Sequence, residues 1–317
     1  MNIVFLDRKS IGSDLDLSSY DELGKVTMYD FSSPEEVPER VKDADIIVTN
    51  KVPVNEKTVG GAEQLKLVCV TATGTNNLDK AFLESRGIQW RNVAGYSTNS
   101  VAQHTFALLF YIWEHSRYYD DYVKDGRYAE DRLFTHFENN YRELAGKTWG
   151  VIGLGAIGKK VAQIAEAFGC NVQYYSTSGA NHNSDFKETG FEELLETSDI
   201  ISIHAPLNEK TEGLIDISAL RKMKKSAVLL NLGRGPIIVE KDLMQAIEEN
   251  GIWAAGLDVL SEEPMSRQSP FLGYRNSDRL FITPHIAWAS VEARIRLMDI
   301  IKGQIKEFVD NNGIEGQ

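Results

Sequence analysis

Three residues in the second half of the chain could together perform acid–base chemistry on a carbonyl group. Arg234 lies between two glycines, Glu263 precedes a proline, and His285 follows a Thr-Pro pair. An arginine fork can hold a carboxylate and polarise a neighbouring oxygen. A histidine exchanges a proton near neutral pH, and a carboxylate behind it fixes its tautomer and stabilises the imidazolium. Hydride transfer to a 2-keto acid requires all three functions.

Each of these residues also has a purely structural interpretation. A histidine at a strand end is commonly structural, Glu263 could be a solvated turn residue, and Arg234 could be a charge beside a helix. Two other histidines compete for the acid–base role. His204 also follows an apolar strand but lacks an obvious carboxylate partner. His104 falls in an apolar helical stretch, where a packed, hydrogen-bonded side chain is expected. The functional interpretation therefore depends on the elements around the three residues.

A glycine-rich turn between a strand and a helix predicts a dinucleotide site. The strand at 149–152 runs into a turn with Gly153, Gly155 and Gly158, an amphipathic helix follows, and residues 172–175 form the next strand. In such a unit the first glycine permits the tight turn, the second lets backbone approach a pyrophosphate, and the third allows close helix–strand packing. The positive end of the helix favours the phosphates.

The end of the second strand carries Ser176, where an acidic side chain commonly binds the ribose hydroxyls. A serine removes the charge that would repel a 2′-phosphate, and Thr177 adds a neutral hydroxyl. No arginine follows directly, and the nearest cations in sequence are Lys159, Lys160 and His182. The sequence therefore predicts use of both NAD(H) and NADP(H), with NADPH accepted at least as well as NADH.

Short apolar strands alternate with helical segments along the chain, which predicts an α/β protein with two doubly wound parallel sheets. A Rossmann NAD(P)-binding domain is expected over 99–287, with six or seven strands. A flavodoxin-like substrate domain is expected over 1–98 plus 288–317, completed by the last helix. The expected strands are 3–6, 26–29, 46–49, 67–70, 88–90, 149–152, 172–175, 200–204, 227–231, 253–257 and 280–283.

Two loops at strand ends of the first domain could bind an anionic substrate. One contains Lys51, and the other contains Thr73 and Gly74 among small residues that leave backbone N–H groups accessible. The alternative is a pair of solvated turns. Between the domains, an apolar helical pattern over 97–117 predicts a buried helix. The aromatic but aperiodic segment 118–145 favours a subunit contact over a covering loop.

The composition is that of an ordinary globular protein. The 317 residues carry a net charge of −12, which argues against general binding to nucleic acid or an anionic membrane. Cys69 and Cys170 lie in apolar surroundings without a metal-ligand spacing, so free thiols and no metal site are expected. No basic leader or membrane-length apolar run is present. A cytoplasmic protein is expected.

Four motifs in order resemble the D-isomer-specific 2-hydroxyacid dehydrogenases over nearly the whole chain. They are Gly153-Leu-Gly-Ala-Ile-Gly, Asn231-Leu-Gly-Arg-Gly, Leu257-Asp-Val with Glu-Pro, and Thr283-Pro-His. The resemblance implies that Arg234 binds and polarises the substrate, that Glu263 orients His285, and that His285 is the acid/base. It also implies that backbone around Thr73 and Gly74 holds the substrate carboxylate, and that Asp258 lies near the nicotinamide carboxamide. The cofactor-binding residues expected are Gly153, Gly155, Ala156, Ile157, Gly158, Ser176, Thr177, His204, Ala205, Pro206, Thr211, Leu232, Gly233 and Asp258.

Within this family the chain looks most like the glycerate dehydrogenases, also called hydroxypyruvate reductases. Ser100-Val-Ala-Gln-His and Pro284-His-Ile-Ala-Trp are similar to that branch. Trp288 replaces a glycine common elsewhere in the family and could cap the substrate pocket or pack in the domain hinge. Formate dehydrogenases use glutamine where this chain has Glu263, which counts against them.

The resemblance implies an NAD(P)-dependent dehydrogenase for D-glycerate and hydroxypyruvate, and a homodimer with residues 118–145 in the contact. Two alternatives remain open. The substrate could be another 2-keto acid, such as glyoxylate or phenylpyruvate. The chain could also be a dinucleotide-sensing binding protein, because transcriptional corepressors share this fold and much of the site.

Overall fold

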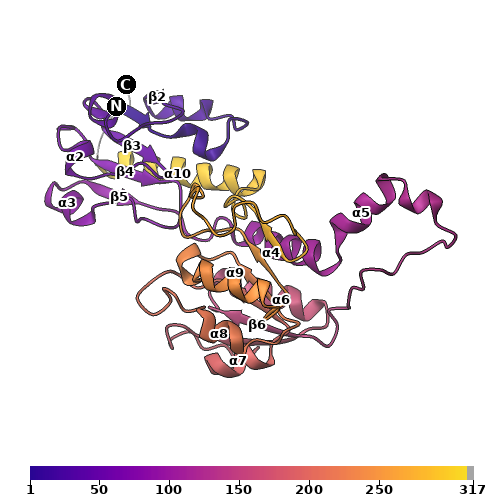
Figure 1. Ribbon diagram of the computed structural model, residues 1–317. Coiled ribbons are helices and arrows are strands. Elements are labelled where there is room, and N and C mark those ends of the chain that lie inside the picture. The colour runs from indigo at the N-terminus through magenta and orange to yellow at the C-terminus, as the bar shows by residue number, and fades with distance from the viewer. Residues whose placement is uncertain (313–317) are drawn as a thin grey trace. The chain divides into compact units, whose positions relative to one another are not determined.

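The computed structural model describes residues 1–312. These residues form two compact units. Figure 1 colours the chain by residue number, so the first unit contains both the indigo N-terminal part and the yellow C-terminal helix. The first unit contains residues 1–97 together with the segment from Ala289 onward, and the second contains Thr98–Trp288. Among the described residues, none of the helices combines the length and the apolar character needed to cross a membrane.

The first unit is built on a five-stranded parallel sheet in the order β2-β1-β3-β4-β5. Its central strands β3 and β4 are buried at every position, as expected for a sheet covered on both faces. The last helix of the chain completes this unit. Its elements are β1 (Asn2–Phe5), η1 (Arg8–Ile11), η2 (Ser18–Leu23), β2 (Lys25–Met28), α1 (Val37–Val41), β3 (Ile46–Thr49), α2 (Glu56–Val59), β4 (Leu67–Val70), α3 (Lys80–Ser85), β5 (Gln89–Arg91) and α10 (Val291–Asn312).

The second unit has a seven-stranded parallel sheet in the order β12-β11-β10-β9-β6-β7-β8. The chain reverses its direction of travel across the sheet at β6 and β9, which is the switch point where doubly wound sheets bind ligands. The predicted α/β class with two parallel sheets is confirmed. The elements after the long helix segment are β6 (Thr148–Ile152), α6 (Ala156–Ala167), β7 (Asn171–Tyr175), β8 (Lys187–Glu188), α7 (Phe191–Thr197), β9 (Ile200–Ile203), α8 (Ile217–Lys222), β10 (Val228–Asn231), η4 (Gly235–Ile237), α9 (Glu240–Glu248), β11 (Ala254–Leu257) and β12 (Leu280–Ile282).

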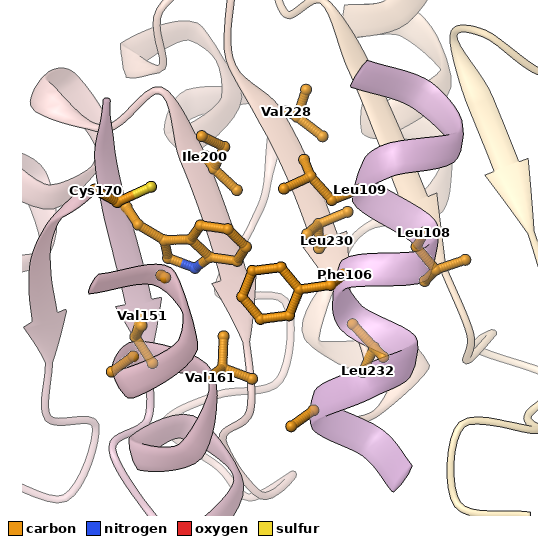
Figure 2. Packing of buried hydrophobic residues seen from close by; sticks show 14 of the residues in the cluster. Phe106, Leu108, Leu109, Val151, Val161, Cys170, Ile200, Val228, Leu230 and Leu232 are labelled. Atoms are coloured by element: carbon orange, nitrogen blue, oxygen red, sulfur yellow. The ribbon is translucent and has the colours of Figure 1, made fainter. Parts of the chain in front are cut away.

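Helix α4 (Thr98–Trp113) packs its apolar residues on this sheet. Figure 2 shows Phe106 and Leu109 pointing from α4 toward Ile200, Val228 and Leu230 of the strands. The Phe106 ring lies 4.9 Å from the ring of a buried tryptophan on β6. Interior aromatic packing of this kind makes α4 a rigid support for the strand ends beside it.

The sequence placed one helix over 97–117, and that expectation is wrong at its C-terminal end. Helix α4 stops at Trp113, and His115 adopts a left-handed backbone with φ of 49°. A new helix, α5 (Ser116–Lys124), then begins, and a short 3-10 helix, η3 (Arg127–Glu130), follows. A left-handed residue ends a helix, but here a histidine replaces the glycine that would have signalled it.

The segment 118–145 is more ordered than its aperiodic sequence indicated. Tyr122 on α5 stacks on His136, with ring centroids 3.8 Å apart, and its hydroxyl donates to Asp131 at 2.6 Å. In contrast, Phe134 and Phe137 are 90% and 72% exposed. In Figure 1, α5 lies well away from the sheet helices α6 to α9 of the same unit.

Candidate active site

The glycine turn after β6 has the shape that a dinucleotide requires. Gly153 has φ of 92°, and a Cβ there would lie 2.7 Å from the Ala205 backbone nitrogen. A Cβ on Gly158 would lie 2.2 Å from the Gly153 carbonyl oxygen, so helix and turn are in close contact. A Cβ on Gly155 would meet nothing within 4 Å, which leaves room on that side of the turn. The turn therefore fits a pyrophosphate.

Helix α6 begins at Ala156 and Ile157, directly after this turn. No side chain among residues 1–312 caps its N-terminal N–H groups. Those donors and the positive end of the helix dipole are suited to bind phosphate.

Ser176 follows β7 at the position expected for the ribose. It is 8% exposed, and within residues 1–312 its hydroxyl oxygen has no hydrogen-bond partner. Two of the cations nearest in sequence have acidic partners. Lys159 lies 3.6 Å from Asp185, and His182 Nδ1 lies 2.8 Å from Glu188, whose hydrogen bond raises the pKa of His182.

The loop after β9 is fixed by its own hydrogen bonds. The Thr211 hydroxyl, fully buried, donates to the Pro206 carbonyl at 2.7 Å and accepts from the Asn208 N–H at 2.8 Å. A Cβ on Gly233 would lie 2.9 Å from the Ala205 carbonyl oxygen, so the loops after β9 and β10 pack against each other. Leu232 before it is only 7% exposed. These predicted cofactor residues thus also shape the edge of the sheet.

His204 differs sharply from a proton-transfer group. Both of its ring nitrogens are inaccessible and lack a hydrogen-bond partner within the described part of the chain, although the residue as a whole is half-buried. Burial lowers its pKa to about 3. A neutral imidazole without a carboxylate is a poor rival to His285 as the acid.

Burial of His204 predicts an acid-sensitive contribution to stability. The folded pKa lies below the unfolded value of about 6.5, so the unfolded chain binds a proton that the folded chain does not. The free energy of unfolding should therefore be unaffected by this group above pH ~6.5 and fall by up to about 1.4 kcal/mol per pH unit below it.

Urea unfolding of His204→Phe and wild type at several pH values between neutral and pH ~4 tests this. The variant should lose stability less steeply as the pH falls. His182→Asn at an exposed histidine is the matched control and should leave the steepness nearly unchanged, because solvent screens exposed pairs. Parallel curves for His204→Phe and wild type would show that His204 is not held neutral by burial.

The loop that carries Arg234 is clamped by a buried asparagine. Asn231, at the end of β10, is 0% exposed. Its Oδ1 accepts from the Gly233 N–H at 3.0 Å, and its Nδ2 donates to the Arg234 carbonyl at 2.9 Å. The guanidinium of Arg234 donates to the Gly233 carbonyl at 2.7 Å. The backbone under Arg234 is therefore held on both sides.

Gly235 brings this loop against the segment that carries Glu263. A Cβ on Gly235 would lie 1.9 Å from the Leu260 carbonyl, a distance that no side chain tolerates. The Leu260 N–H in turn donates to Glu263 Oε1 at 2.9 Å. The sequence motif predicted the position of Arg234 but not this contact. The second glycine of the Gly-Arg-Gly motif is the sequence feature that corresponds to the contact.

Glu263 and His285 form a direct pair. Glu263 Oε2 lies 2.6 Å from His285 Nδ1, and the two side chains are 35% and 27% exposed. A proton on Nδ1 in this bond leaves Nε2 as the atom that can exchange a proton with a substrate. Arg234, Glu263 and His285 follow the adjacent strands β10, β11 and β12, at their carboxyl ends. The structure thus places the three predicted residues along one sheet edge.

The backbone of His285 is held in an unusual conformation. Its φ is 56°, a left-handed value that costs a residue with a side chain about 1–3 kcal/mol. The His285 N–H donates to the Asp258 carbonyl at 2.8 Å and to the Thr283 carbonyl at 3.0 Å. Strained residues of this kind are found at functional sites when their surroundings fix them.

Asp258 is buried beneath this segment, at 1% exposure. Its Oδ1 accepts from the Thr283 hydroxyl at 2.6 Å and from the Ile286 N–H at 2.9 Å. Its Oδ2 accepts from the Ala287 N–H at 2.9 Å. Asp258 therefore organises the His285 segment, a role that its motif did not reveal. Its expected place near the nicotinamide stays a prediction.

The candidate substrate loops of the first unit follow adjacent strands. Asp7, a buried carboxylate after β1, accepts from the N–H groups of Asn50 and Lys51 at 2.8–3.0 Å. Burial raises the pKa of Asp7, and these two N–H bonds oppose the rise. After β4, the Thr73 hydroxyl donates to the Val93 carbonyl at 2.9 Å. No sequence motif marks Asp7.

The exposure of three other predicted substrate-binding residues differs. Gly74 follows Thr73 and is half-buried, whereas the Lys51 side chain is exposed. In the second unit, Trp288 is partly buried against the apolar cluster that contains α4. Its packing suits either a pocket wall or a structural anchor.

Comparison with known proteins identifies the family. A family model described as D-isomer specific 2-hydroxyacid dehydrogenase, NAD binding domain, matches residues 106–287. The chain is 38% identical over 320 residues to a hydroxypyruvate reductase of Blautia hydrogenotrophica, covering 99% of this chain and 98% of that protein. It is 35% identical over 308 residues to a glycerate dehydrogenase of Methylorubrum extorquens, covering 97% and 96%. The chain belongs to the D-isomer specific 2-hydroxyacid dehydrogenases.

Two further proteins are similar to this 2-hydroxyacid dehydrogenase over most of its length. A glyoxylate reductase of Korarchaeum cryptofilum is 34% identical over 286 residues, covering 87% of this chain and 83% of that protein. The solved structure of an acyclic imino acid reductase in complex with NADPH and D-Arg has a TM-score of 0.85 and 29% identity, covering 98% of both chains. The chain is thus an oxidoreductase that acts on a CH–OH group and has an NAD-binding domain, as its sequence predicted.

Proposed function

We propose that this 2-hydroxyacid dehydrogenase reduces hydroxypyruvate to D-glycerate and catalyses the reverse reaction. The names of the relatives with 38% and 35% identity support this choice of substrate. The single observation that carries the chemistry is the 2.6 Å pair between Glu263 and His285, at the sheet edge that also bears Arg234. That set of residues suits a 2-keto acid, because the acid has a carboxylate to bind and a keto oxygen to protonate.

The turn at Gly153–Gly158 and the start of α6 would hold the pyrophosphate of the dinucleotide, and Ser176 and Thr177 would face its ribose. A bound nicotinamide would supply a hydride to the substrate carbon. The protein itself binds the substrate, polarises the keto oxygen and transfers the proton.

Arg234 binds the substrate carboxylate and polarises the keto oxygen with a second N–H. His285 Nε2–H donates a proton to that oxygen, and Glu263 stabilises the imidazolium before the transfer. In the reverse direction, neutral His285 removes the hydroxyl proton. The Lys51 ammonium and the backbone N–H groups near Thr73 and Gly74 are further groups suited to a carboxylate.

A panel of 2-keto acids tests the proposed substrate. The panel holds hydroxypyruvate, glyoxylate, pyruvate and phenylpyruvate, each assayed with NADH and NADPH. Hydroxypyruvate should give the highest kcat/KM. A higher kcat/KM for glyoxylate or phenylpyruvate would assign this chain to another substrate within the family. Binding of the dinucleotide without turnover of any acid would favour the corepressor-like binding protein.

Trp288 is expected to restrict the pocket to small acids. Trp288→Gly should raise kcat/KM for phenylpyruvate relative to hydroxypyruvate, because it removes a bulky wall. The variant is assayed on the same panel, and its thermal unfolding is recorded beside it. A lower melting temperature with an unchanged substrate ranking would instead identify Trp288 as a structural anchor of the apolar cluster.

Ser176 is expected to permit both cofactors. Its buried hydroxyl has no partner in the described chain and carries no charge against a 2′-phosphate. Ser176→Asp should lower kcat/KM for NADPH selectively, because it places a carboxylate where the phosphate would bind. Ser176→Asn is the matched control, similar in size and without charge. A wild type that strictly prefers NADH, or an unchanged preference in the aspartate variant, would place discrimination elsewhere.

We also propose a homodimer in which residues 118–145 form the contact. Phe134 and Phe137 in that segment are largely exposed, and apolar side chains at this exposure favour burial by a partner. Sedimentation equilibrium measures the mass of the protein in solution and tests this proposal. A monomer at micromolar concentration would contradict it.

A further inference from the structure

A second histidine contacts the segment that carries His285. His104 is on α4, and its side chain is 20% exposed. Its Nε2 lies 2.9 Å from the Thr283 hydroxyl and 3.6 Å from Asp258 Oδ1. The first distance is that of a hydrogen bond, and the second is too long for one.

The direction of the bond between His104 and Thr283 follows from counting hydrogens. A threonine hydroxyl has one hydrogen, and that of Thr283 is donated to Asp258 Oδ1 at 2.6 Å. The Thr283 oxygen must therefore accept from His104. This assigns the neutral Nε2–H tautomer, or the imidazolium, to His104, and the donor chain runs from His104 through Thr283 to Asp258.

Asp258 transmits this chain to the backbone around His285. Its two oxygens accept from the N–H groups of Ile286 and Ala287, directly after the left-handed His285. Ser100, one turn before His104 on α4, donates to the Ala287 carbonyl at 2.6 Å. Helix α4 therefore holds the segment at Thr283 on one side of His285 and at Ala287 on the other.

We propose that His104 is a positioning residue for His285, acting through Thr283 and Asp258 to hold the imidazole on Glu263. The proposal rests on the proposed function, since positioning matters to turnover only if His285 transfers the proton. His104 itself donates one hydrogen bond and exchanges no proton with the substrate. The property that counts is an N–H at the position of Nε2.

Two substitutions at His104 distinguish a role as hydrogen-bond donor from a role in packing. His104→Leu removes the donor and should lower kcat by roughly 10–10²-fold, the loss that follows from slight misplacement of a reacting group, with the KM for NAD(P)H unchanged. His104→Gln places an amide N–H near the Nε2 position and should restore most of kcat. Gln103→Leu, at the exposed neighbouring position on α4, is the matched control and should behave like wild type.

A double-mutant cycle tests whether the effect passes through Thr283. Thr283→Val removes the acceptor of the His104 bond, so His104→Leu should lower kcat little further in that background. Likewise, His104→Leu added to His285→Ala should have no further effect. Full additivity in either background would overturn the proposed route.

Hydrogen exchange gives a second measure without cofactor or turnover. In the cofactor-free full chain, the Ile286 and Ala287 amides should exchange faster in His104→Leu than in wild type, and at wild-type rates in His104→Gln. Unchanged exchange in His104→Leu, or equal loss of kcat in the leucine and glutamine variants, would overturn the inference. Wild-type turnover of His285→Ala would instead overturn the proposed function, so the two failures are distinguishable.

Discussion

Replacing His285 with alanine is expected to lower keto-acid reduction by roughly 10²–10⁴-fold, the usual contribution of a positioned general acid. The variant loses the Nε2–H that would protonate the keto oxygen, while the glycine turn after β6 is untouched. Steady-state rates with hydroxypyruvate, together with quenching of protein fluorescence by NADH, measure both properties. Turnover should fall, and the dissociation constant for NADH should stay unchanged.

Glu263→Gln is the informative companion to that variant. A glutamine can still accept from His285 Nδ1 with its one carbonyl oxygen, but it then gives up the bond from the Leu260 N–H and lacks the charge that stabilises the imidazolium. A smaller loss of kcat than in His285→Ala is expected. Near-normal turnover in His285→Ala would remove His285 from the mechanism. His204 would then be the alternative candidate for the general acid, although both of its ring nitrogens are buried.

Arg234→Lys is expected to produce the second large effect. Lysine keeps the positive charge but loses the planar fork, so it cannot hold a carboxylate and polarise the keto oxygen at the same time. We expect a higher KM for the keto acid and a lower kcat, with kcat/KM reduced by about 10²–10³-fold, as for loss of a donor to a developing oxyanion. Initial rates over a range of hydroxypyruvate concentrations give both constants.

Arg221→Lys, at an exposed position on α8, is the matched control for the same change of side chain. It should leave kcat/KM as in wild type. If Arg234→Lys also leaves kcat/KM unchanged, the substrate carboxylate is held by other groups, such as the Lys51 ammonium or the backbone N–H groups near Thr73.

The strands were predictable because buried parallel strands are continuous apolar runs. Residues 46–49 and 67–70 coincide with β3 and β4, which are buried at every position. Two features left no such signal. The exposed pair Lys187–Glu188 forms β8 with no apolar residue. Helix α4 ends at a left-handed histidine, His115, in place of a glycine.

For the candidate site, the sequence allowed prediction of which residues are involved and of the strands that they follow. Motifs gave the positions of Arg234, Glu263 and His285, because loops at the carboxyl ends of parallel strands meet at one edge. The supporting contacts were not predictable. The Asn231 clamp, the close approach of Gly235 to Leu260, and the bonds of Asp258 to Ile286 and Ala287 all depend on how separate strands lie in space.

The proposed activity is tested by the reaction of the purified wild-type protein with hydroxypyruvate and a reduced nicotinamide cofactor. Absorbance follows cofactor oxidation, and chiral chromatography identifies the product. We expect that one NADH or NADPH is consumed for each D-glycerate formed, and that His285→Ala protein prepared in parallel is slower by at least about 10²-fold. Formation of L-glycerate, or binding of the cofactor without its oxidation, would show that the protein is not a D-glycerate dehydrogenase.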